Sequence, residues 1–231
     1  MNDKHALFRM KAMKNNNQWV FKLMLPYLGK NILEVGSGIG NLTELLIPLG
    51  RRLILTDVDT EYVDYLRKRF AGNPGVRIIP HDIQRPFPAG SLSSDIDTVV
   101  CVNVLEHIKD DHRALENISN LLQNGGTLFL MVPALELLYG SLDKMLGHFR
   151  RYEKNDLLDK LRSRGFTVDK IYFHNFFSAF GWLLNSRILK RRFISHFQIS
   201  ALDCVIPVLA ALEGTAKLPL GISLVAVCRK Y

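Results

Sequence analysis

A glycine-rich turn directly follows an apolar run near the start of the chain. Residues 31–36 are strongly apolar, and Gly36, Ser37, Gly38 and Gly40 follow in close succession. Glycine has no Cβ, so a turn of this kind lets the backbone approach a ligand closely. The third glycine comes one residue earlier than the dinucleotide-binding pattern G-x-G-x-x-G requires. The turn therefore indicates a ligand other than a dinucleotide.

Two carboxylates accompany this turn. Glu34 stands two residues before the first glycine, and Asp57 ends the next apolar run, residues 52–57. A carboxylate beside the loop suits S-adenosylmethionine (SAM), which carries an ammonium group and no phosphate, better than it suits NAD. Asp57 can accept hydrogen bonds from both ribose hydroxyls. The alternative is that Asp57 caps the next helix, a position that Asp59 or Thr60 could fill instead.

A third polar group follows the apolar run at residues 76–80. Asp82 can accept a hydrogen bond from an adenine amino group, while the side chain of Ile83 packs on the ring. An aspartate in a loop is otherwise usually only solvated. Beside the other two signals, however, the pair favours a nucleoside ligand.

The segment Cys101–His107 completes a pattern that resembles a known family. Together, ILEVGSGIGNLT, LILTDVD and VNVLEHI resemble the class I SAM-dependent methyltransferases, in particular the bacterial small-molecule branch of methyltransferase types 11 and 12. The resemblance covers about residues 17–135, and residues 138–152 and 218–227 also look like that branch. It implies SAM as cofactor and S-adenosylhomocysteine as product. It assigns the methionine end of SAM to Gly36, Ser37 and Gly38 with a backbone contact from Asn103, the ribose and adenine to Asp57 and Val58, and the adenine to Asp82 and Ile83, with Glu34 near the loop.

Alternating strands and helices must hold these residues. Runs apolar on both faces indicate a parallel sheet covered by helices on both sides, which binds ligands at the carboxyl ends of its strands. The resemblance implies a Rossmann-like α/β fold with seven strands, mostly parallel, the last antiparallel. We expect one domain over residues 1–231, with an N-terminal helix at about 17–28 and a helical insertion at about 176–217 between the last two strands. Further strands are expected at 97–103 and 127–132, and helices at 41–49, about 62–70 and 114–122.

Several later residues are candidates for the chemistry of methyl transfer. A protonated oxygen or nitrogen acceptor benefits from a positioned base, and His107 and His148 are the candidates. Arg150 and Arg151 could clamp an anionic acceptor, since guanidinium groups suit carboxylate and phosphate. The alternatives are a structural His107 and arginines that anchor the loop through ion pairs to Asp143, Glu153 or the first helix. Tyr139 and Tyr152 are further candidates for acceptor binding.

Composition narrows the class of protein. The chain is 48% hydrophobic and 23% charged, which is ordinary for a globular protein. Its three separated cysteines fit neither a disulfide framework nor a zinc site, and we expect no bound metal. No secretory signal or long apolar span is evident, so a cytoplasmic location is expected. The net charge is +8, and basic residues dominate after Gly147. They form either a solvated basic face or a site for an anionic substrate, an anionic membrane surface or nucleic acid.

The aromatic run at residues 171–184 adds one more alternative. Basic residues follow it at Arg187, Lys190, Arg191 and Arg192, so the segment could rest peripherally on an anionic membrane, line a pocket for a lipophilic acceptor, or form core. The favoured function is methyl transfer to an O, N or C atom of a small molecule. Competing hypotheses are an RNA methyltransferase and a non-catalytic SAM-binding or membrane-interaction module. The Asn103-Val-Leu-Glu turn argues only against enzymes that methylate exocyclic base amines, which usually carry Asn/Asp-Pro-Pro-aromatic at this point.

Overall fold

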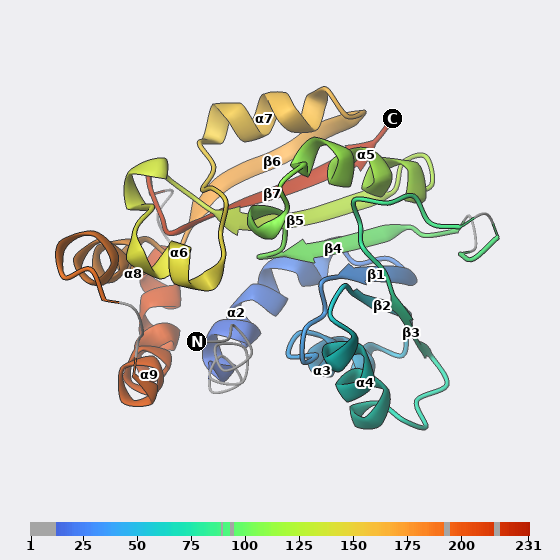
Figure 1. Ribbon diagram of the computed structural model, residues 1–231, viewed down its shortest axis with the longest axis horizontal. Coiled ribbons are helices and arrows are strands. Elements are labelled where there is room, and N and C mark those ends of the chain that lie inside the picture. The colour runs from blue at the N-terminus through green and yellow to red at the C-terminus, as the bar shows by residue number, and fades with distance from the viewer. Residues whose placement is uncertain (1–12, 89, 93–94, 192–194, 215–217) are drawn as a thin grey trace.

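The strands form one sheet in the computed structural model, which describes residues 13–231 except 89, 93–94, 192–194 and 215–217 (Figure 1). Within these residues, seven strands lie in the order β3-β2-β1-β4-β5-β7-β6. Strands β1 to β5 pair in parallel, whereas β7 is antiparallel to both β5 and β6. The prediction of a mostly parallel sheet with an antiparallel last strand is confirmed. The strands are β1 (Asn31–Val35), β2 (Arg52–Asp57), β3 (Val76–Pro80), β4 (Thr98–Val102), β5 (Thr127–Pro133), β6 (Phe166–His174) and β7 (Ser223–Lys230).

Both faces of the central strands are buried, as their continuous apolar sequences predict. Successive side chains of a strand point to opposite faces. Leu33 and Val35 of β1 accordingly pack in one apolar cluster, whereas Ile32 packs in another on the other face. The first cluster includes α5 (Asp111–Leu121) and α7 (Lys154–Arg162), and the second includes α2 (Lys14–Met24), α3 (Thr43–Leu46) and α4 (Thr60–Arg69). Helices therefore cover the sheet on both sides (Figure 1).

Prolines shorten two of the expected helices. Helix α2 begins at Lys14, and the chain continues as a 3-10 turn at Leu25–Tyr27, where Pro26 stands. Helix α3 likewise gives way to a 3-10 turn at Ile47–Leu49, which contains Pro48. Proline lacks the backbone N–H that an α-helical turn needs, so both helices end earlier than apolar periodicity alone suggests.

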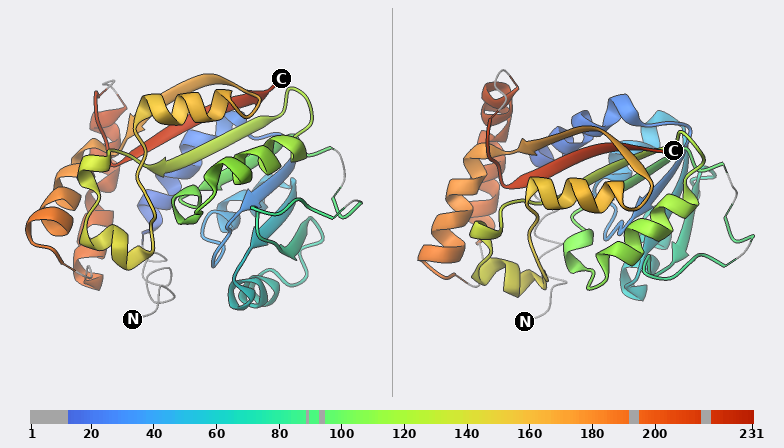
Figure 2. Two further views of the ribbon diagram at one scale, coloured as in Figure 1. Left: turned by 45° about the horizontal axis from the view of Figure 1, so that its top comes forward. Right: turned by 90° about the horizontal axis from the view of Figure 1, so that it is seen from above.

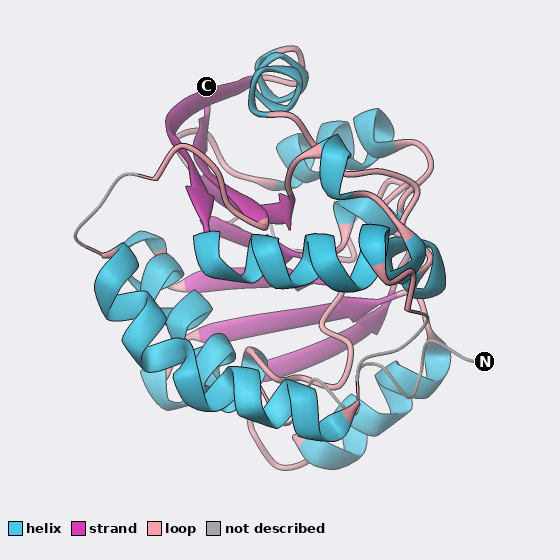
Figure 3. Ribbon diagram, turned by 90° about the vertical axis from the view of Figure 1, so that its left-hand side faces the viewer, coloured by secondary structure: helices cyan, strands magenta, loops and turns pink. Residues whose placement is uncertain are grey.

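A separate group of helices occupies one end of the molecule. Between β6 and β7 the chain forms α8 (Phe176–Trp182), the π-helical turn η5 (Leu183–Ile188) and α9 (His196–Glu213). These helices lie beyond the ends of β4 and β5, beside α6 (Ser141–Leu146), as Figures 1 and 2 show. Figure 3 views the molecule from this end, with helices in front of the sheet. None of the helices in the described part of the chain is long and apolar enough to cross a membrane.

The strand register brings the predicted site residues to one edge of the sheet. Val35 pairs with Thr56 of β2 and with Cys101 of β4, and Asp57 pairs with Pro80 of β3. The residues that follow these strands therefore leave the sheet at neighbouring points. This edge is the carboxyl edge of the parallel strands, where the sequence places the ligand.

The glycine turn at this edge tolerates no side chain at its first position. Gly36 has φ +67°, and a Cβ there would lie 2.4 Å from Cγ2 of Val104, whereas Gly50 has a similar φ of +64° with nothing within 4 Å. Both Gly36→Ala and Gly50→Ala should incur left-handed strain, but Gly36→Ala should also incur overpacking. We expect Gly36→Ala to lower the free energy of unfolding by about 1–3 kcal/mol more than Gly50→Ala, as measured by urea denaturation. Equal losses would contradict this account of the turn.

Candidate functional site

The glycine turn is fastened to the end of strand β2. The backbone N–H of Ser37 donates to the carbonyl of Thr56 at 2.9 Å, and Gly38 N–H donates to the Asp57 carboxylate at 2.8 Å. Gly36 and Gly38 have positive φ angles of +67° and +52°. These angles are cheap for glycine and rare for other residues. The turn and Asp57 therefore form one rigid unit at the carboxyl edge of the sheet.

Asp57 is the polar centre of this unit. Its second oxygen accepts from the backbone N–H of Asp59 at 3.0 Å. Asp59 itself accepts from the N–H of Glu61 and caps helix α4, so the capping role considered for Asp57 belongs to Asp59. Burial raises the pKa of Asp57, and the two backbone donors partly oppose that shift. Both oxygens still have lone pairs for the hydroxyls of a ribose.

The apolar surface next to Asp57 comes from Val58 and not from Ile83. The Val58 side chain is 71% exposed, whereas Ile83 is 5% exposed and packs in the core. Asn117 Nδ2 holds the Ile83 carbonyl at 2.7 Å, which fixes this turn from behind. Asp82 accepts from the backbone and side-chain amides of Gln84. The expectation that the Ile83 side chain packs on an adenine ring does not fit this arrangement, because the core already contains that side chain.

Glu34 lies behind the glycine turn. Its side chain is 4% exposed, and the Thr43 hydroxyl donates to it at 2.6 Å. Burial raises the pKa of Glu34 to about 7, and the nearby Asp57 adds to the shift while Thr43 opposes it. The carboxylate is thus held by the protein itself, and a ligand ammonium would meet it only from the side of the turn.

Asn103 leaves the end of β4 in an uncommon backbone conformation. Its φ is +53°, in the left-handed region that asparagine tolerates better than most residues. Its N–H donates to the Met131 carbonyl at 2.9 Å, and the residue is exposed. The bend therefore turns the chain away from the sheet at the edge where the sequence places the methionine end of SAM.

A second cluster centres on Asp143 of α6, close to His148. Asp143 is fully buried, and its Oδ1 lies 3.0 Å from Nδ1 of His148 and accepts from Nε of Arg151 at 2.8 Å. Its Oδ2 accepts from Gly140 N–H at 2.9 Å and from Trp182 Nε1 at 3.1 Å. Burial opposes ionisation, but the His148 hydrogen bond and the Arg151 charge hold the pKa of Asp143 below its usual value. The ionised carboxylate can only accept, so Nδ1 of His148 donates to it; in the neutral imidazole of this tautomer, Nε2 carries the lone pair.

The predicted acceptor-binding residues make contacts within the protein. Arg151 is buried on Asp143 and donates to the Ala134 carbonyl, as the ion-pair alternative expected. Arg150 pairs with Asp111 at 2.9 Å, and the Tyr152 hydroxyl donates to the same carboxylate at 2.9 Å. Burial strongly raises the pKa of Tyr152, with a further contribution from Asp111.

Tyr139 also makes an internal contact, because its hydroxyl donates to the His148 carbonyl at 2.8 Å. The four predicted acceptor ligands, Arg150, Arg151, Tyr152 and Tyr139, thus hold the loop that carries His148.

Glu106 is a buried residue that the sequence analysis did not assign to the site. Its Oε1 lies 3.9 Å from Nε2 of His148, and its Oε2 has no hydrogen-bond partner among the described residues. Burial raises the pKa of Glu106 to about 7, although His148 opposes the shift. The His107 ring packs edge-on against His148 at 4.7 Å, and desolvation together with His148 lowers the pKa of His107 to about 4. The only sequence signal for the group was the tandem Glu106-His107 after β4.

These three side chains also match the donor set of a metal site. Glu106, His107 and His148 offer ligand atoms within 4.8 Å of one another. Two imidazoles and a carboxylate are suitable ligands for a divalent transition metal. The same geometry can act without a metal, with Nε2 of His148 as a base and Glu106 next to it.

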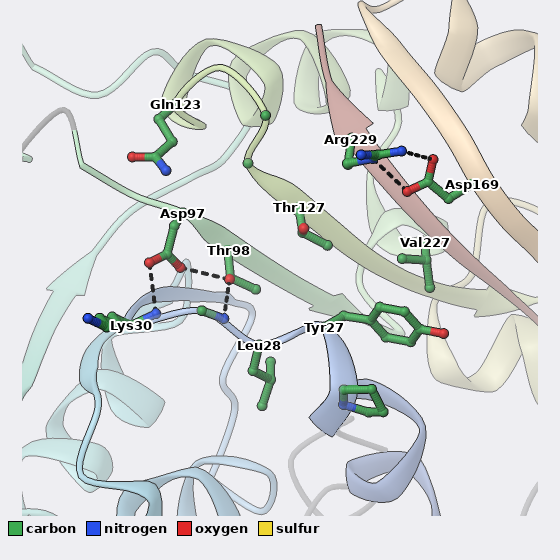
Figure 4. Close-up of a pocket in the computed structure, with 14 residues that line it drawn as sticks. Tyr27, Leu28, Lys30, Asp97, Thr98, Gln123, Thr127, Asp169, Val227 and Arg229 are labelled. Atoms are coloured by element: carbon green, nitrogen blue, oxygen red, sulfur yellow. Dashed lines mark hydrogen bonds and ion pairs between the residues drawn. The ribbon is translucent and has the colours of Figure 1, made fainter.

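A large cleft lies at the opposite edge of the sheet. It has a volume of about 710 Å³ and lies at the amino ends of β1, β4 and β5 (Figure 4). Asp97 accepts there from the N–H groups of Lys30 and Asn31 and from the Thr98 hydroxyl. Its carboxylate thus holds together the start of two strands. The cleft is separate from both clusters at the carboxyl edge, so we do not assign it to the site.

Comparison with known proteins identifies methyltransferases as relatives. Residues 33–130 match the sequence model of the family described as "Methyltransferase domain". The chain is 29% identical over 144 residues to "Probable S-adenosylmethionine-dependent methyltransferase" of Mycolicibacterium smegmatis, covering 61% of this chain and 53% of that protein. A highly reducing polyketide synthase of Penicillium soppii is 30% identical over 138 residues, which are 54% of this chain and 5% of the synthase. The chain thus spans about half the length of the Mycolicibacterium smegmatis protein and a small part of the polyketide synthase.

A solved structure shows the same fold. The SAM-dependent methyltransferase of Mesorhizobium loti has a TM-score of 0.61 at 15% identity, covering 91% of this chain and 96% of that one. Residues 33–130 thus match the methyltransferase domain family, and the chain has the fold of a SAM-dependent methyltransferase of known structure. SAM is the cofactor named for both the Mycolicibacterium smegmatis relative and the Mesorhizobium loti structure. The Rossmann-like fold inferred from the sequence is confirmed.

The buried Glu106 predicts a pH-dependent stability. A pKa of about 7, above the ordinary 4.5, means that the folded state binds the proton more tightly than the unfolded state. The free energy of unfolding should therefore fall as pH rises from about 4.5 to about 7 and then level off. Glutamine does not ionise, so Glu106→Gln removes this fall in stability. As pH rises from 5 to 8, the free energy of unfolding of the variant should increase relative to that of wild type, as measured by urea denaturation. Glu116→Gln, at an exposed position of α5, is the control and should not change relative to wild type. If the difference in free energy of unfolding between Glu106→Gln and wild type does not change with pH, the account of a buried carboxylate at Glu106 is wrong.

Proposed function

We propose that the protein transfers a methyl group from SAM to an oxygen, nitrogen or carbon atom of a small-molecule acceptor. The observation that carries the proposal is the unit formed by the glycine turn and Asp57, joined by the Gly38–Asp57 hydrogen bond at 2.8 Å. It places a carboxylate with free lone pairs beside a turn in which Gly36 and Gly38 carry no side chain. The exposed Val58 follows directly and supplies an apolar surface of the kind that a purine ring packs on.

Each part of this edge has a role in the proposal. Gly36, Ser37 and Gly38 face the methionine end of SAM with their backbone, and the bend at Asn103 approaches the same end. Asp57 accepts from the ribose hydroxyls, and Val58 packs on the adenine. Asp82 accepts from the adenine amino group, and the backbone at Ile83 supports the turn. Glu34 attracts the ammonium group through the turn. The hydrogen bonds that hold the turn, Asp57 and Asp82 preorganise the site, which lowers the entropy cost of binding.

His148 is the proposed base for an oxygen or nitrogen acceptor. SAM supplies a methyl group on a sulfonium, whose sulfur leaves with the bonding electron pair as S-adenosylhomocysteine. The acceptor forms the new bond to carbon, and its proton passes to Nε2 of His148. Asp143 orients the imidazole and stabilises its protonated form, as a carboxylate does for a catalytic histidine. Alignment of the reacting atoms supplies much of the remaining acceleration.

Replacement of Asp57 tests the cofactor site. Asp57→Asn keeps the size of the side chain but removes the charge and one acceptor for the ribose hydroxyls. We expect the Kd for S-adenosylhomocysteine to rise about tenfold or more by titration calorimetry, because a hydrogen bond to a charged group contributes about 1.5–3 kcal/mol. Asp59→Asn, which keeps the cap of α4, is the matched control and should change the Kd less than about twofold. NAD is the second ligand in the titration. If wild type does not bind S-adenosylhomocysteine, the cofactor assignment is refuted.

Replacement of His148 tests the base. In His148→Asn the amide nitrogen can still donate to Asp143, but no group remains at the position of Nε2. Transfer of labelled methyl groups from SAM to aqueous and organic fractions of cell extracts should fall by about 100-fold or more. The Kd for S-adenosylhomocysteine should stay within about twofold of wild type, and the exposed His112→Asn should keep full activity.

The same assay separates the base from a metal. If the Glu106-His107-His148 group acts without an ion, wild-type activity should survive EDTA. Loss of activity in EDTA, restored by one divalent metal, would instead make His148 a ligand and overturn its role as the base.

A further inference from the structure

The helices between β6 and β7 expose an unusual amount of apolar surface. Phe197 is 81% exposed, and large apolar side chains lie open along α8, η5 and α9. Exposed large apolar side chains that gather on one segment of a protein mark a candidate contact surface. We define the apolar face by its exposed members, which are Phe177, Phe180, Leu184, Ile188, Leu189, Phe197, Leu202, Val205, Val208 and Leu212.

In the described part of the chain, helix α9 is held against α2 by the side that carries Asp203. Asp203 is buried and accepts from the N–H groups of Asn15 and Asn16 at the start of α2, both at 3.0 Å. Ile206, one turn further, is also buried. The opposite stripe has the helical spacing of 4, 3 and 4 residues from Ala201 through Val205, Val208 and Leu212, and all four are exposed. The exposed stripe thus faces away from the helix that holds α9.

The charges beside the apolar face have one sign. Arg187, Lys190 and Arg191 are exposed where η5 ends. The acidic residues in the described part of α8–α9 point inward, because Asp203 binds α2 and Glu213 accepts from the N–H groups of Asn175 and Phe176. Arg192, which the sequence analysis grouped with these basic residues, lies outside the described residues. An anionic surface complements this arrangement, whereas a second copy of the chain would bring like charges together.

The same helices hold the candidate catalytic loop. Trp182 of α8 donates to Asp143, and its ring lies 4.9 Å from the Arg151 guanidinium. Arg187 donates to the Tyr139 carbonyl at 3.0 Å, and Ser141 donates to the Ser186 carbonyl at 2.9 Å. The apolar face and the loop of His148 therefore belong to one packed unit.

We propose that the apolar face lies on the surface of a bilayer that contains anionic phospholipids. Its side chains enter the boundary between headgroups and acyl chains, and Arg187, Lys190 and Arg191 contact the lipid phosphates. A lipophilic acceptor is then drawn from the bilayer toward His148. This last step rests on the proposed methyl transfer, but the binding to lipid does not.

Sedimentation with vesicles tests the proposal. The full chain is mixed with vesicles of phosphatidylcholine alone or with 30 mol% phosphatidylglycerol, on the order of the anionic content that attracts basic surfaces. Wild type should sediment with the anionic vesicles, less so at high salt, and little with phosphatidylcholine alone. Val208→Glu should lower the partition coefficient about tenfold or more, and so should the double variant Lys190→Glu, Arg191→Glu.

A matched control separates this face from net charge. The double variant Arg67→Glu, Lys68→Glu makes the same change of charge at exposed positions of α4 and should bind like wild type. All variants should bind S-adenosylhomocysteine as wild type does, which shows that they are folded and keeps this test apart from that of the methyl transfer. Failure of wild type to sediment, or equal loss in the α4 control, would overturn the proposal.

Two other outcomes identify a different occupant. A dimer in light scattering that Val208→Glu dissociates would make the face a contact between two copies of the chain. Binding that appears only after removal of residues 1–12 would assign the face to the amino-terminal segment. Either result would overturn the proposal for the full chain.

Discussion

The buried carboxylate of Asp143 connects α6, the loop at 148–151 and α8. It accepts from four donors, which come from its own helix cap, from the loop at 148–151 and from α8. Without these donors an ionised carboxylate could not remain in the interior, because desolvation of a charge is expensive unless it is paired and hydrogen-bonded. Three features therefore depend on the same carboxylate: the position of His148, the inward orientation of Arg151 and the attachment of α8.

The four buried carboxylates of the two clusters fall into two electrostatic types. Asp143 is surrounded by donors and a guanidinium, and its pKa is held low. Asp57, Glu34 and Glu106 have raised pKa values. Burial outweighs the hydrogen bonds to Asp57 and Glu34, and it outweighs the opposing effect of His148 at Glu106. Opposite shifts in neighbouring groups are typical of sites that handle charge or protons. A SAM ammonium near Glu34 and a protonated imidazole near Glu106 would each bring a positive charge to a carboxylate that lacks one.

The sequence predicted the fold well because the fold depends on local patterns, and the proposed cofactor edge depends on the same kind of pattern. Apolar runs and breakers located the strands, and the glycine turn with Asp57 after the next strand is a short-range signal. The loop of His148 was harder, because its contacts join distant parts of the chain. Spacing alone could not show that Arg151 turns inward to Asp143, that Ile83 packs in the core so that Val58 remains as the exposed residue, or that Glu106 is buried beside His148. Each of these depends on which face of a loop the packing leaves open.

The exposed stripe of α9 has a cost that the fold by itself does not explain. Burial of apolar surface is the main favourable term in folding, and an exposed row of valine and leucine gives up that gain. The acidic side chains of the segment nevertheless point inward and its basic side chains point outward. Trp182 also joins the segment to the loop of His148 by its hydrogen bond to Asp143. Apolar surface that is retained next to positive charge and rigidly joined to a candidate catalytic loop has a physical reason if its environment is a lipid interface. On a bilayer the apolar side chains of the stripe would be removed from water, which is favourable, and a lipophilic acceptor would already be at the same surface.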